Sequence, residues 1–271
     1  MVERSKRKKA KRKKLALLGS HARSWVWGRN VVREALAAGR WRVLELLLAE
    51  NLPAAELEEA RSAALLAGVT PQIVGPGVLE QQAHTAEHQG YLAKMGPYPY
   101  RTVDDVLSAA PAHPLFLILD SIQDPFNFGA MLRSAGAFGV NGVFIGTHRQ
   151  VPVTSMVARS SAGVVNHVPI VQVAELTGLA RTLRERGIRL IGATEKAETL
   201  LTECDLRKAT AIVVGNEGTG ISPELLACCE AQVRIPIEPV ASSLNAAAAA
   251  AVFFFEAWRQ RAESIKSATD S

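Results

Sequence analysis

Two short apolar stretches, each followed by a polar or glycine-rich loop, constrain the fold more than any other part of the chain. Residues 211–214 (Ala-Ile-Val-Val) predict a buried strand, and residues 215–220 (Gly-Asn-Glu-Gly-Thr-Gly) form the loop after it. A second predicted strand, 233–237, leads to residues 243–245 (Ser-Leu-Asn) and an alanine-rich helix. In open α/β sheets, ligands bind beyond the carboxyl ends of the strands, so these two loops are the expected binding site.

Strand-like and helix-like segments alternate over residues 113–262. Apolar runs that predict strands lie at 115–119, 142–145, 168–171 and 189–192, and helices are predicted at 128–138 and 155–162. A further helix carries Leu176, Leu179 and Leu183 on one face and ends at Gly187. Ser222 followed by Pro223 predicts another helix start, with the serine as N-cap. This alternation predicts an α/β fold with a mostly parallel sheet that helices cover on both faces.

A smaller α/β unit is predicted at residues 24–96. Its expected helices are 30–36 and 54–67, and its expected strands are 43–48, 72–74 and 91–95. Glycine and proline mark residues 97–112 as a linker with a short helix at 103–110. The expected organisation is therefore a tail (1–23), an N-terminal domain (24–96), this linker, a second domain (113–262) and a C-terminal tail (263–271).

The basic charge of the chain is concentrated at its N-terminus. The formal net charge is +5, yet residues 1–14 hold nine Lys or Arg and one acid, a sum of +8, which leaves about −3 for the remainder. Such a segment cannot bury apolar surface and is predicted to be disordered alone. We expect it to bind a polyanion such as RNA through counterion release. A partner-free solvated tail and a nuclear-import signal are the alternatives.

Cysteine content and hydropathy indicate the cellular compartment of the protein. Cys204, Cys228 and Cys229 offer neither a disulfide framework nor the spacing of a zinc site, which favours the reducing cytoplasm. No apolar run reaches the ~18 residues of a membrane span, and no signal peptide is visible. We therefore expect a cytoplasmic protein without a metal or a membrane partner.

Three blocks of sequence resemble the signatures of the SpoU/TrmH branch of the SPOUT RNA methyltransferases. They are residues 124–135 (Asp-Pro-Phe-Asn-Phe-Gly-Ala-Met-Leu-Arg-Ser-Ala), residues 214–221, and residues 235–237 together with 243–245. The N-terminal unit, with Gly-Arg-Asn at 28–30 and His-Gln-Gly at 88–90, is similar to the ribosomal-protein-like RNA-binding domain of one subfamily. That subfamily methylates a guanosine 2′-hydroxyl in bacterial large-subunit rRNA.

The resemblance implies a knotted fold, a cofactor and a homodimer. In the family, the C-terminal part of the parallel sheet is threaded into a trefoil knot, an exception to the rule against knots. The loops of the knot bind S-adenosylmethionine, and the cofactor-binding positions fall on Thr194, Gly215, Ile235 and Leu244. The catalytic or substrate-contacting positions fall on Asn127, Arg133, Glu217, Ser243 and Asn245.

Physical chemistry gives roles to these side chains. Methyl transfer needs in-line positioning of the ribose oxygen and removal of its proton. Arginine keeps its charge because its pKa lies above ~12, so Arg133 is expected to orient a phosphate rather than to act as a base. Asn127 and Asn245 can orient ribose hydroxyls, and Glu217 could hold Arg133 or balance charge.

Each of these roles has a structural alternative. Asn127 and Asn245 could serve as helix N-caps, and Arg133 could pair with an acid on a helix surface. Arg149 and Arg159 could bind RNA phosphates, but single exposed arginines more often make surface pairs.

The sequence departs from the family at two places, and its substrate stays open. Residues 246–251 are unbroken alanine, and Glu238-Pro239 replaces a segment that is commonly small and glycine-containing. The favoured substrate is an rRNA guanosine. The alternatives are a drug-resistance-type rRNA adenosine, a tRNA ribose, and a catalytically silent RNA-binding or ribosome-assembly protein.

Overall fold

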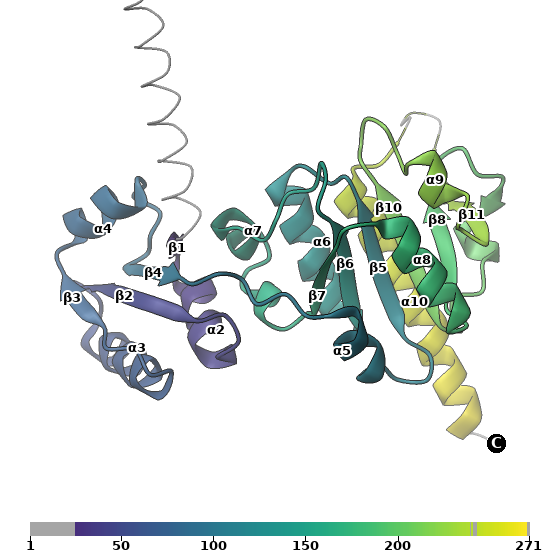
Figure 1. Ribbon diagram of the computed structural model, residues 1–271. Coiled ribbons are helices and arrows are strands. Elements are labelled where there is room, and N and C mark those ends of the chain that lie inside the picture. The colour runs from purple at the N-terminus through teal and green to yellow at the C-terminus, as the bar shows by residue number, and fades with distance from the viewer. Residues whose placement is uncertain (1–24, 239, 241–242, 270–271) are drawn as a thin grey trace, which may run out of the picture. The chain divides into compact units, whose positions relative to one another are not determined.

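The computed structural model describes residues 25–238, 240 and 243–269 (Figure 1). The predicted RNA tether at residues 1–14 and Pro239 lie outside the described residues. The chain divides into two compact units. Among the described residues, unit 1 comprises 25–99 and 153–166, and unit 2 comprises the remainder. No helix in the described part of the chain combines the length and apolar character needed to cross a bilayer.

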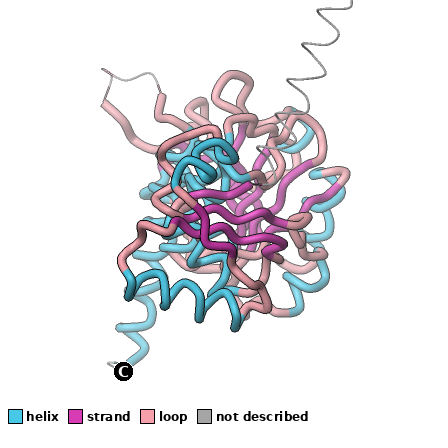
Figure 2. Tube along the Cα trace, turned by 90° about the vertical axis from the view of Figure 1, so that its left-hand side faces the viewer, coloured by secondary structure: helices cyan, strands magenta, loops and turns pink. Residues whose placement is uncertain are grey.

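Unit 1 is built on a four-stranded sheet in the order β1-β4-β2-β3. The strand β4 (Tyr91–Met95) runs antiparallel to β1 (Trp25–Trp27) and β2 (Val43–Ala49), and β2 pairs in parallel with β3 (Gln72–Val74). Its helices are α2 (Arg29–Ala38), α3 (Ala54–Leu66), α4 (Pro76–Ala83) and α7 (Ser155–Ser160), with a 3-10 turn, η1 (Val164–Asn166). Figure 2, in which this unit faces the viewer, shows its strands side by side with helices flanking them. The strands and helices predicted between residues 24 and 96 are present, and β1 and α4 were not predicted.

Residues 153–166, far along the chain, complete unit 1. Met156 packs against the core that contains Trp25 and Trp27, and the Tyr98 hydroxyl donates to the Val165 carbonyl at 2.9 Å. Gly163 has φ +87°, and a Cβ atom there would lie 2.6 Å from the Cβ atom of Glu34, so only glycine fits. The segment is therefore packed into this unit rather than looping over its surface.

Arg159 of the same segment is fully engaged within unit 1. Its guanidinium lies 4.4 Å from the centroid of the Trp27 ring and 3.1 Å from the Glu87 carboxylate. Of the two roles considered for this arginine, the structure shows the ion pair.

Unit 2 contains a seven-stranded sheet in the order β7-β6-β5-β10-β8-β11-β9, with every neighbouring pair parallel. The strands are β5 (Leu115–Asp120), β6 (Gly142–Gly146), β7 (Ile170–Val173), β8 (Arg189–Ala193), β9 (Thr199–Leu200), β10 (Thr210–Gly215) and β11 (Ala231–Arg234). The helices are α5 (Val103–Ser108), α6 (Pro125–Ala137), α8 (Leu176–Glu185), α9 (Pro223–Leu226) and α10 (Ala246–Thr269), with a 3-10 turn, η2 (Leu201–Glu203). The predicted α/β class with a mostly parallel sheet is confirmed. The trefoil knot stays a prediction, because strand order alone does not establish threading.

The core of unit 2 follows from strand periodicity. Every residue of β5 and β10 is buried, as expected for central parallel strands that are covered on both faces. Phe116 and Ile118 of β5 pack in one cluster with Leu179 and Leu183 of α8. Helices α6 and α10 pack against each other, and Figure 1 shows α10 behind the sheet and α8 in front of it. The sheet thus separates two helical layers.

Two local predictions are wrong in detail. The strand predicted at 233–237 ends at Arg234, and residues 235–237 have no regular structure; Pro236, which has no N–H to donate, stands at this point. Helix α6 begins at Pro125 rather than at 128. Its N-cap is Asp124, whose carboxylate accepts a hydrogen bond from the Phe126 N–H at 2.9 Å, so Asn127 is not the cap.

Candidate active site

A cavity of ≈ 380 Å³ lies at the carboxyl ends of β8, β10 and β11 and at the start of α10. Seven of the nine predicted site residues line it: Thr194, Gly215, Glu217, Ile235, Ser243, Leu244 and Asn245. Apolar side chains, among them Ile221, Leu226 and Phe253, complete the wall. The cavity thus gathers residues from loops that follow three different strands, the position expected for a ligand in an α/β sheet.

The loop after β10 is held in one shape by its own backbone and by Asn216. Asn216 and Gly220 exchange two backbone hydrogen bonds, at 3.2 and 2.8 Å, and the Asn216 Oδ1 accepts from the Gly218 N–H at 2.8 Å. The Asn216 Nδ2 donates to the Ser121 carbonyl at 3.0 Å, which ties this loop to the end of β5. A Cβ atom on Gly215 would lie 2.1 Å from the Gly220 carbonyl carbon. Glycine is therefore the one residue that allows the loop to fold back so closely.

Asp120, the last residue of β5, anchors the start of α9. Its carboxylate accepts hydrogen bonds from the Ser222 N–H at 2.7 Å and from the Ser222 hydroxyl at 2.6 Å. Ser222 occupies the N-cap position, as predicted, but its hydroxyl does not cap the helix because it is committed to Asp120. The carboxylate is nearly buried (7% exposed), and these charge-assisted bonds hold the loop against the strand.

Three side chains from the three sequence blocks meet at the mouth of the cavity. The Asn127 Nδ2 donates to the Glu217 carboxylate, and the Asn245 Nδ2 donates to the Asn127 Oδ1 at 3.0 Å. The Asn245 Oδ1 also accepts from the N–H groups of Ala247 and Ala248 at 2.9 and 3.3 Å, so this residue caps α10 as well. Glu217 therefore pairs with Asn127 rather than with Arg133. We call Asn127, Glu217 and Asn245 the polar cluster.

Arg133 lies apart from the polar cluster. It is exposed on α6, does not line the cavity, and makes no ion pair or hydrogen bond with any residue that the structure describes. It lies six positions after Asn127, so the two side chains project from different faces of the helix. The alternative of a surface ion pair is not seen. Arg149, after β6, is likewise exposed and has no such partner within the described ranges.

Neither the alanine run nor Glu238 closes the cavity. Ala246 and Ala249 line the cavity, and Ala250 is fully buried, so the small side chains leave space at the start of α10. Glu238 is exposed and is not among the described residues of the lining.

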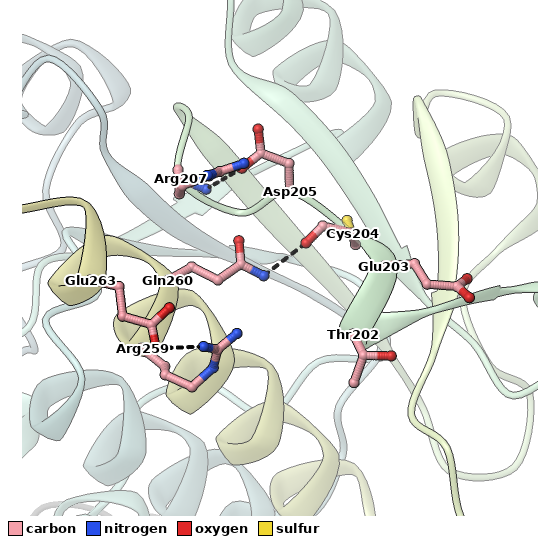
Figure 3. Close-up of a pocket in the computed structure, with 8 residues that line it drawn as sticks. All are labelled: Thr202, Glu203, Cys204, Asp205, Arg207, Arg259, Gln260 and Glu263. Atoms are coloured by element: carbon pink, nitrogen blue, oxygen red, sulfur yellow. Dashed lines mark hydrogen bonds and ion pairs between the residues drawn. The ribbon is translucent and has the colours of Figure 1, made fainter. Parts of the chain in front are cut away.

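A second cavity, of ≈ 480 Å³, lies beside the other half of α10 and contains none of the predicted residues (Figure 3). Its lining consists of Thr202, Glu203, Cys204, Asp205, Arg207, Arg259, Gln260 and Glu263. Both arginines of the lining are paired with acids: Arg207 pairs with Asp205 at 2.8 Å, and Arg259 pairs with Glu263 at 2.7 Å. The hydrogen bond from Arg207 holds the pKa of Asp205 below its ordinary value. Since both of its cationic side chains are already paired and none of the predicted residues lines it, this cavity is the weaker candidate.

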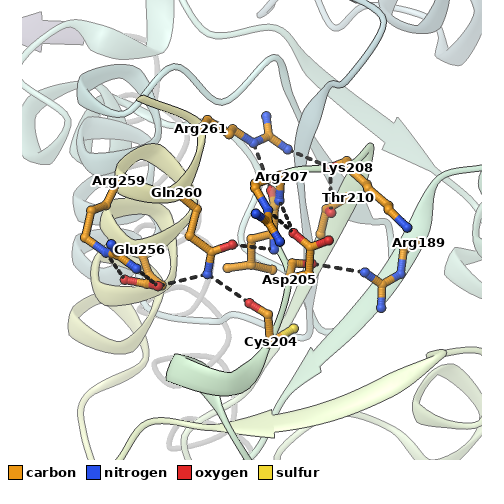
Figure 4. A network of polar contacts seen from close by, with 11 residues as sticks. Arg189, Cys204, Asp205, Arg207, Lys208, Thr210, Glu256, Arg259, Gln260 and Arg261 are labelled. Atoms are coloured by element: carbon orange, nitrogen blue, oxygen red, sulfur yellow. Dashed lines mark hydrogen bonds and ion pairs between the residues drawn. The ribbon is translucent and has the colours of Figure 1, made fainter. Parts of the chain in front are cut away.

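Above this cavity, α10 is fastened to the amino-terminal end of the sheet (Figure 4). The Arg261 guanidinium donates to the carbonyls of Leu206, His113, Pro114 and Lys208 at 2.9–3.2 Å. Gln260 accepts from the Leu206 N–H and donates to the Cys204 carbonyl, at 2.8 and 2.9 Å. We call Gln260 and Arg261 the clasp. It was not predicted, because carbonyl acceptors leave no trace in a sequence.

Sequence reasoning also missed Asp120 and the role of Asn216. The signal available for Asp120 was an acid at the end of an apolar strand. For Asn216, it was an asparagine inside a glycine-rich turn. No group of three or more His, Cys, Asp or Glu side chains placed to hold a metal ion is found among the described residues.

Comparison with known proteins tests the predicted resemblance. Residues 114–255 match the model of the SpoU rRNA Methylase family, and residues 25–101 match that of the RNA 2′-O ribose methyltransferase substrate-binding domain. YacO of Bacillus subtilis, named as a TrmH family tRNA/rRNA methyltransferase, is 35% identical over 248 residues, which cover 89% of this chain and 98% of YacO. The 23S rRNA (guanosine-2′-O-)-methyltransferase RlmB of Shewanella oneidensis is 33% identical over 238 residues, which cover 87% of this chain and 97% of RlmB.

A solved structure extends the likeness to the fold. The SpoU methyltransferase AviRb of Streptomyces viridochromogenes, determined in complex with the cofactor AdoMet, has a TM-score of 0.76 and 27% identity, covering 88% of this chain and 90% of AviRb. The family model spans more than half of the chain, and both relatives align over nearly their whole length. The predicted resemblance is confirmed, and this chain is a member of the SpoU rRNA methylase family.

Proposed function

We propose that this protein transfers a methyl group from S-adenosylmethionine to a ribose 2′-hydroxyl of RNA, and that the target is a guanosine of large-subunit rRNA. The polar cluster carries the proposal, because it joins one side chain from each sequence block at the mouth of one cavity. Binding of RNA alone would not require that convergence. The relative named as a 23S rRNA guanosine methyltransferase, which aligns with both units, favours the guanosine over the alternatives.

The cavity fits the proposed cofactor. Its volume of ≈ 380 Å³ falls within the usual range of small-molecule sites. The tight fold at Gly215 leaves the loop after β10 lining the cavity, and apolar side chains such as Ile221 and Phe253 offer contacts for a flat ring. Thr194, Gly215, Ile235 and Leu244 would hold S-adenosylmethionine, which supplies a methyl group activated by a sulfonium centre.

The chain's own residues have to orient the ribose. Asn127 is held from two sides by Glu217 and Asn245, so its amide is preorganised and needs little reorganisation to bind a hydroxyl. The Glu217 carboxylate accepts the hydrogen bond of Asn127 and so fixes the direction of that amide. The Arg133 guanidinium, which has no ion-pair partner among the described residues, is suited to a bidentate bond with an RNA phosphate. We assign acceptance of the hydroxyl proton to that phosphate or to a water molecule.

A homodimer is proposed on the exposed apolar face of α10. Phe255 and Trp258 stack with their ring centroids 6.2 Å apart and are 48% and 50% exposed, and Phe255 also contacts Phe138 edge-on at 6.0 Å. Val252 is 38% exposed beside them. We call these four residues the aromatic face. Contiguous exposed aromatic rings mark protein interfaces, and a second copy of the chain is the proposed partner.

Sedimentation tests the dimer. Replacing Phe255 and Trp258 with serine should convert the protein to a monomer with an unchanged far-ultraviolet spectrum, whereas the unmodified chain should sediment at twice the monomer mass. A monomeric unmodified protein would contradict this part of the proposal.

The cytoplasm is the proposed location. Cys204 is buried, all three cysteines are free thiols, and free thiols persist in a reducing compartment.

Two measurements test the function. Calorimetry with S-adenosylmethionine should show one binding site per chain. Incubation with large-subunit rRNA should then place a ribose methyl group on one guanosine, located by mapping ribose methylation with and without the gene. Binding of RNA without heat from S-adenosylmethionine would instead favour a catalytically silent RNA-binding protein.

A further inference from the structure

Phe126 is an exposed aromatic ring directly beside the polar cluster. It is 57% exposed, although it sits in the first turn of a helix whose opposite side is buried. The preceding cap fixes this turn, since Asp124 accepts the Phe126 N–H at 2.9 Å. Apolar burial within the chain does not explain why a large ring stands here.

Phe126 shares one face of α6 with Arg133. Residues 126, 130, 133 and 137 recur at helical spacing, and none of the four is buried. We call Phe126, Ala130, Arg133 and Ala137 the exposed stripe. About 10 Å of helix rise separates the phenylalanine from the arginine, which is within the span of two nucleotides of single-stranded RNA. The Phe126 ring and the Arg133 guanidinium thus lie on the same face of α6. The other two members of the stripe are alanines, so no other large side chain stands between them.

Charge selects the class of partner. Helix α6 contains no acidic residue, and its one charged side chain, Arg133, has no ion-pair partner in the described part of the chain. By contrast, basic side chains of unit 1 are neutralised by nearby acids, as in the pairs Arg29–Glu56 at 3.0 Å and Arg159–Glu87 at 3.1 Å. A positive stripe with one ring matches an RNA strand, whose phosphates bind guanidinium groups and whose unpaired bases stack on aromatic rings.

We propose that Phe126 stacks on an unpaired base of the substrate RNA, at or next to the nucleotide whose ribose is bound by Asn127. The inference rests on the proposed function. Phe126 and Asn127 are consecutive residues of α6, so their side chains diverge by about 100° around the helix axis. A base next to a ribose held at Asn127 can therefore reach the exposed side of the helix, where the Phe126 ring lies. Phe126 is thereby a positioning and specificity residue for unpaired RNA.

The test compares three variants at this position. Phe126→Ala removes the ring, Phe126→Leu keeps an apolar side chain without an aromatic face, and Phe126→Trp enlarges the ring. Affinity for a short unpaired RNA containing guanosine is measured by fluorescence anisotropy. Alanine and leucine should weaken binding about tenfold, the usual order for loss of one stacked base, and tryptophan should retain or improve it. The KM for RNA should rise in parallel while kcat at saturating RNA and the affinity for S-adenosylmethionine stay near the unmodified values.

Two results would overturn the inference. Leucine binding RNA as well as tryptophan would show that stacking is not involved. A shift to monomer in the alanine variant with unchanged RNA affinity would show that a second copy of the chain covers the ring. Failure of the proposed function is distinguishable, because an unmodified protein that binds RNA but methylates none would still reveal stacking in the anisotropy series.

Discussion

The two ends of α10 differ in their surroundings. At the amino-terminal end of the seven-stranded sheet, Gln260 and Arg261 of this helix hydrogen-bond to backbone groups, whereas at the carboxyl-terminal end of the sheet the helix begins at a cavity. The clasp commits all three guanidinium nitrogens of Arg261 to four backbone carbonyls. At the other end of the same helix, Asn245 of the polar cluster lines the cavity and donates a hydrogen bond to Asn127. One helix therefore carries a stabilising end and a reactive end, and substitutions at the two ends should separate stability from activity.

The largest expected effect follows from Gly215→Ala. The added methyl group would overlap the backbone of Gly220 and Ile221 at 2.1–2.2 Å, so the loop after β10 must move away from the cavity. Affinity for S-adenosylmethionine, measured by calorimetry, should fall by at least ~100-fold, about 2.7 kcal/mol, and methyl transfer should be lost. Gly218→Ala is the control, because its added methyl group would meet only the Asn216 side chain at 3.3 Å. Equal behaviour of the two variants would refute the role of loop shape.

Arg133→Ala should reduce methyl transfer by roughly 100- to 1000-fold, in line with loss of a positioned, charged contact. The guanidinium makes no ion pair or hydrogen bond with other described residues, so the melting temperature and the affinity for S-adenosylmethionine should stay unchanged. Lysine at this position should recover only part of the rate, since it cannot bind a phosphate bidentately. Single-turnover assays on rRNA measure the effect, and a normal rate in the alanine variant would remove Arg133 from the mechanism.

Arg261→Met should act on stability instead. It removes bonds from a charged group to four carbonyls, and allowing for partial exposure we expect a loss of about 2 kcal/mol in the free energy of unfolding. Arg259→Met is the matched control: its pair with Glu263 lies at the surface, and the less exposed Glu256 keeps a hydrogen bond from Gln260, so the loss should be about 1 kcal/mol. Denaturant unfolding gives both values. Activity measured well below the melting temperature should be near normal in each, and loss of activity in the stable fraction of Arg261→Met would break the proposed separation.

Ser222→Ala should have the smallest effect. It tests stability at the carboxyl-terminal end of the seven-stranded sheet. It removes the hydroxyl bond to Asp120 but keeps the backbone bond, so about 1 kcal/mol of stability should be lost. Because α9 flanks the loop after β10, a small weakening of cofactor binding should accompany it, read by calorimetry. A stability loss as large as that of Arg261→Met would mean that both ends of the sheet are held equally tightly.

Local sequence patterns predicted most of the helices and strands, but they did not predict which residues cap or contact them. The β-branched run at 211–214 and the fully apolar run at 115–119 predicted strands that the structure contains as β10 and β5. The strand predicted at 233–237 is too long, because Pro236 has no N–H to donate to a neighbouring strand and β11 ends before it. Asp124 rather than Asn127 caps α6, since two capping residues lie within one turn and periodicity does not choose between them.

Contacts between distant parts of the chain could not be read from the sequence. The three blocks were predicted to share a site by resemblance, yet the bonds from Asn127 to Glu217 and Asn245 join residues 90 and 118 positions apart. The carbonyl acceptors of Arg261 and the burial of residues 153–166 in unit 1 are of the same kind. The type of a side chain indicates which groups it can bind, but its actual partner depends on the fold.

The late segment at 153–166 has a consequence for synthesis of the protein. The four-stranded unit is complete only when α7 and η1 have left the ribosome, 67 residues after Pro99. At typical elongation rates of ~5–20 residues per second, the nascent N-terminal sheet waits roughly 3–13 s with its Trp27 side uncovered. The strands β5 and β6 of unit 2 emerge during this interval, so unit 1 is expected to close only after the first strands of unit 2 have been synthesised.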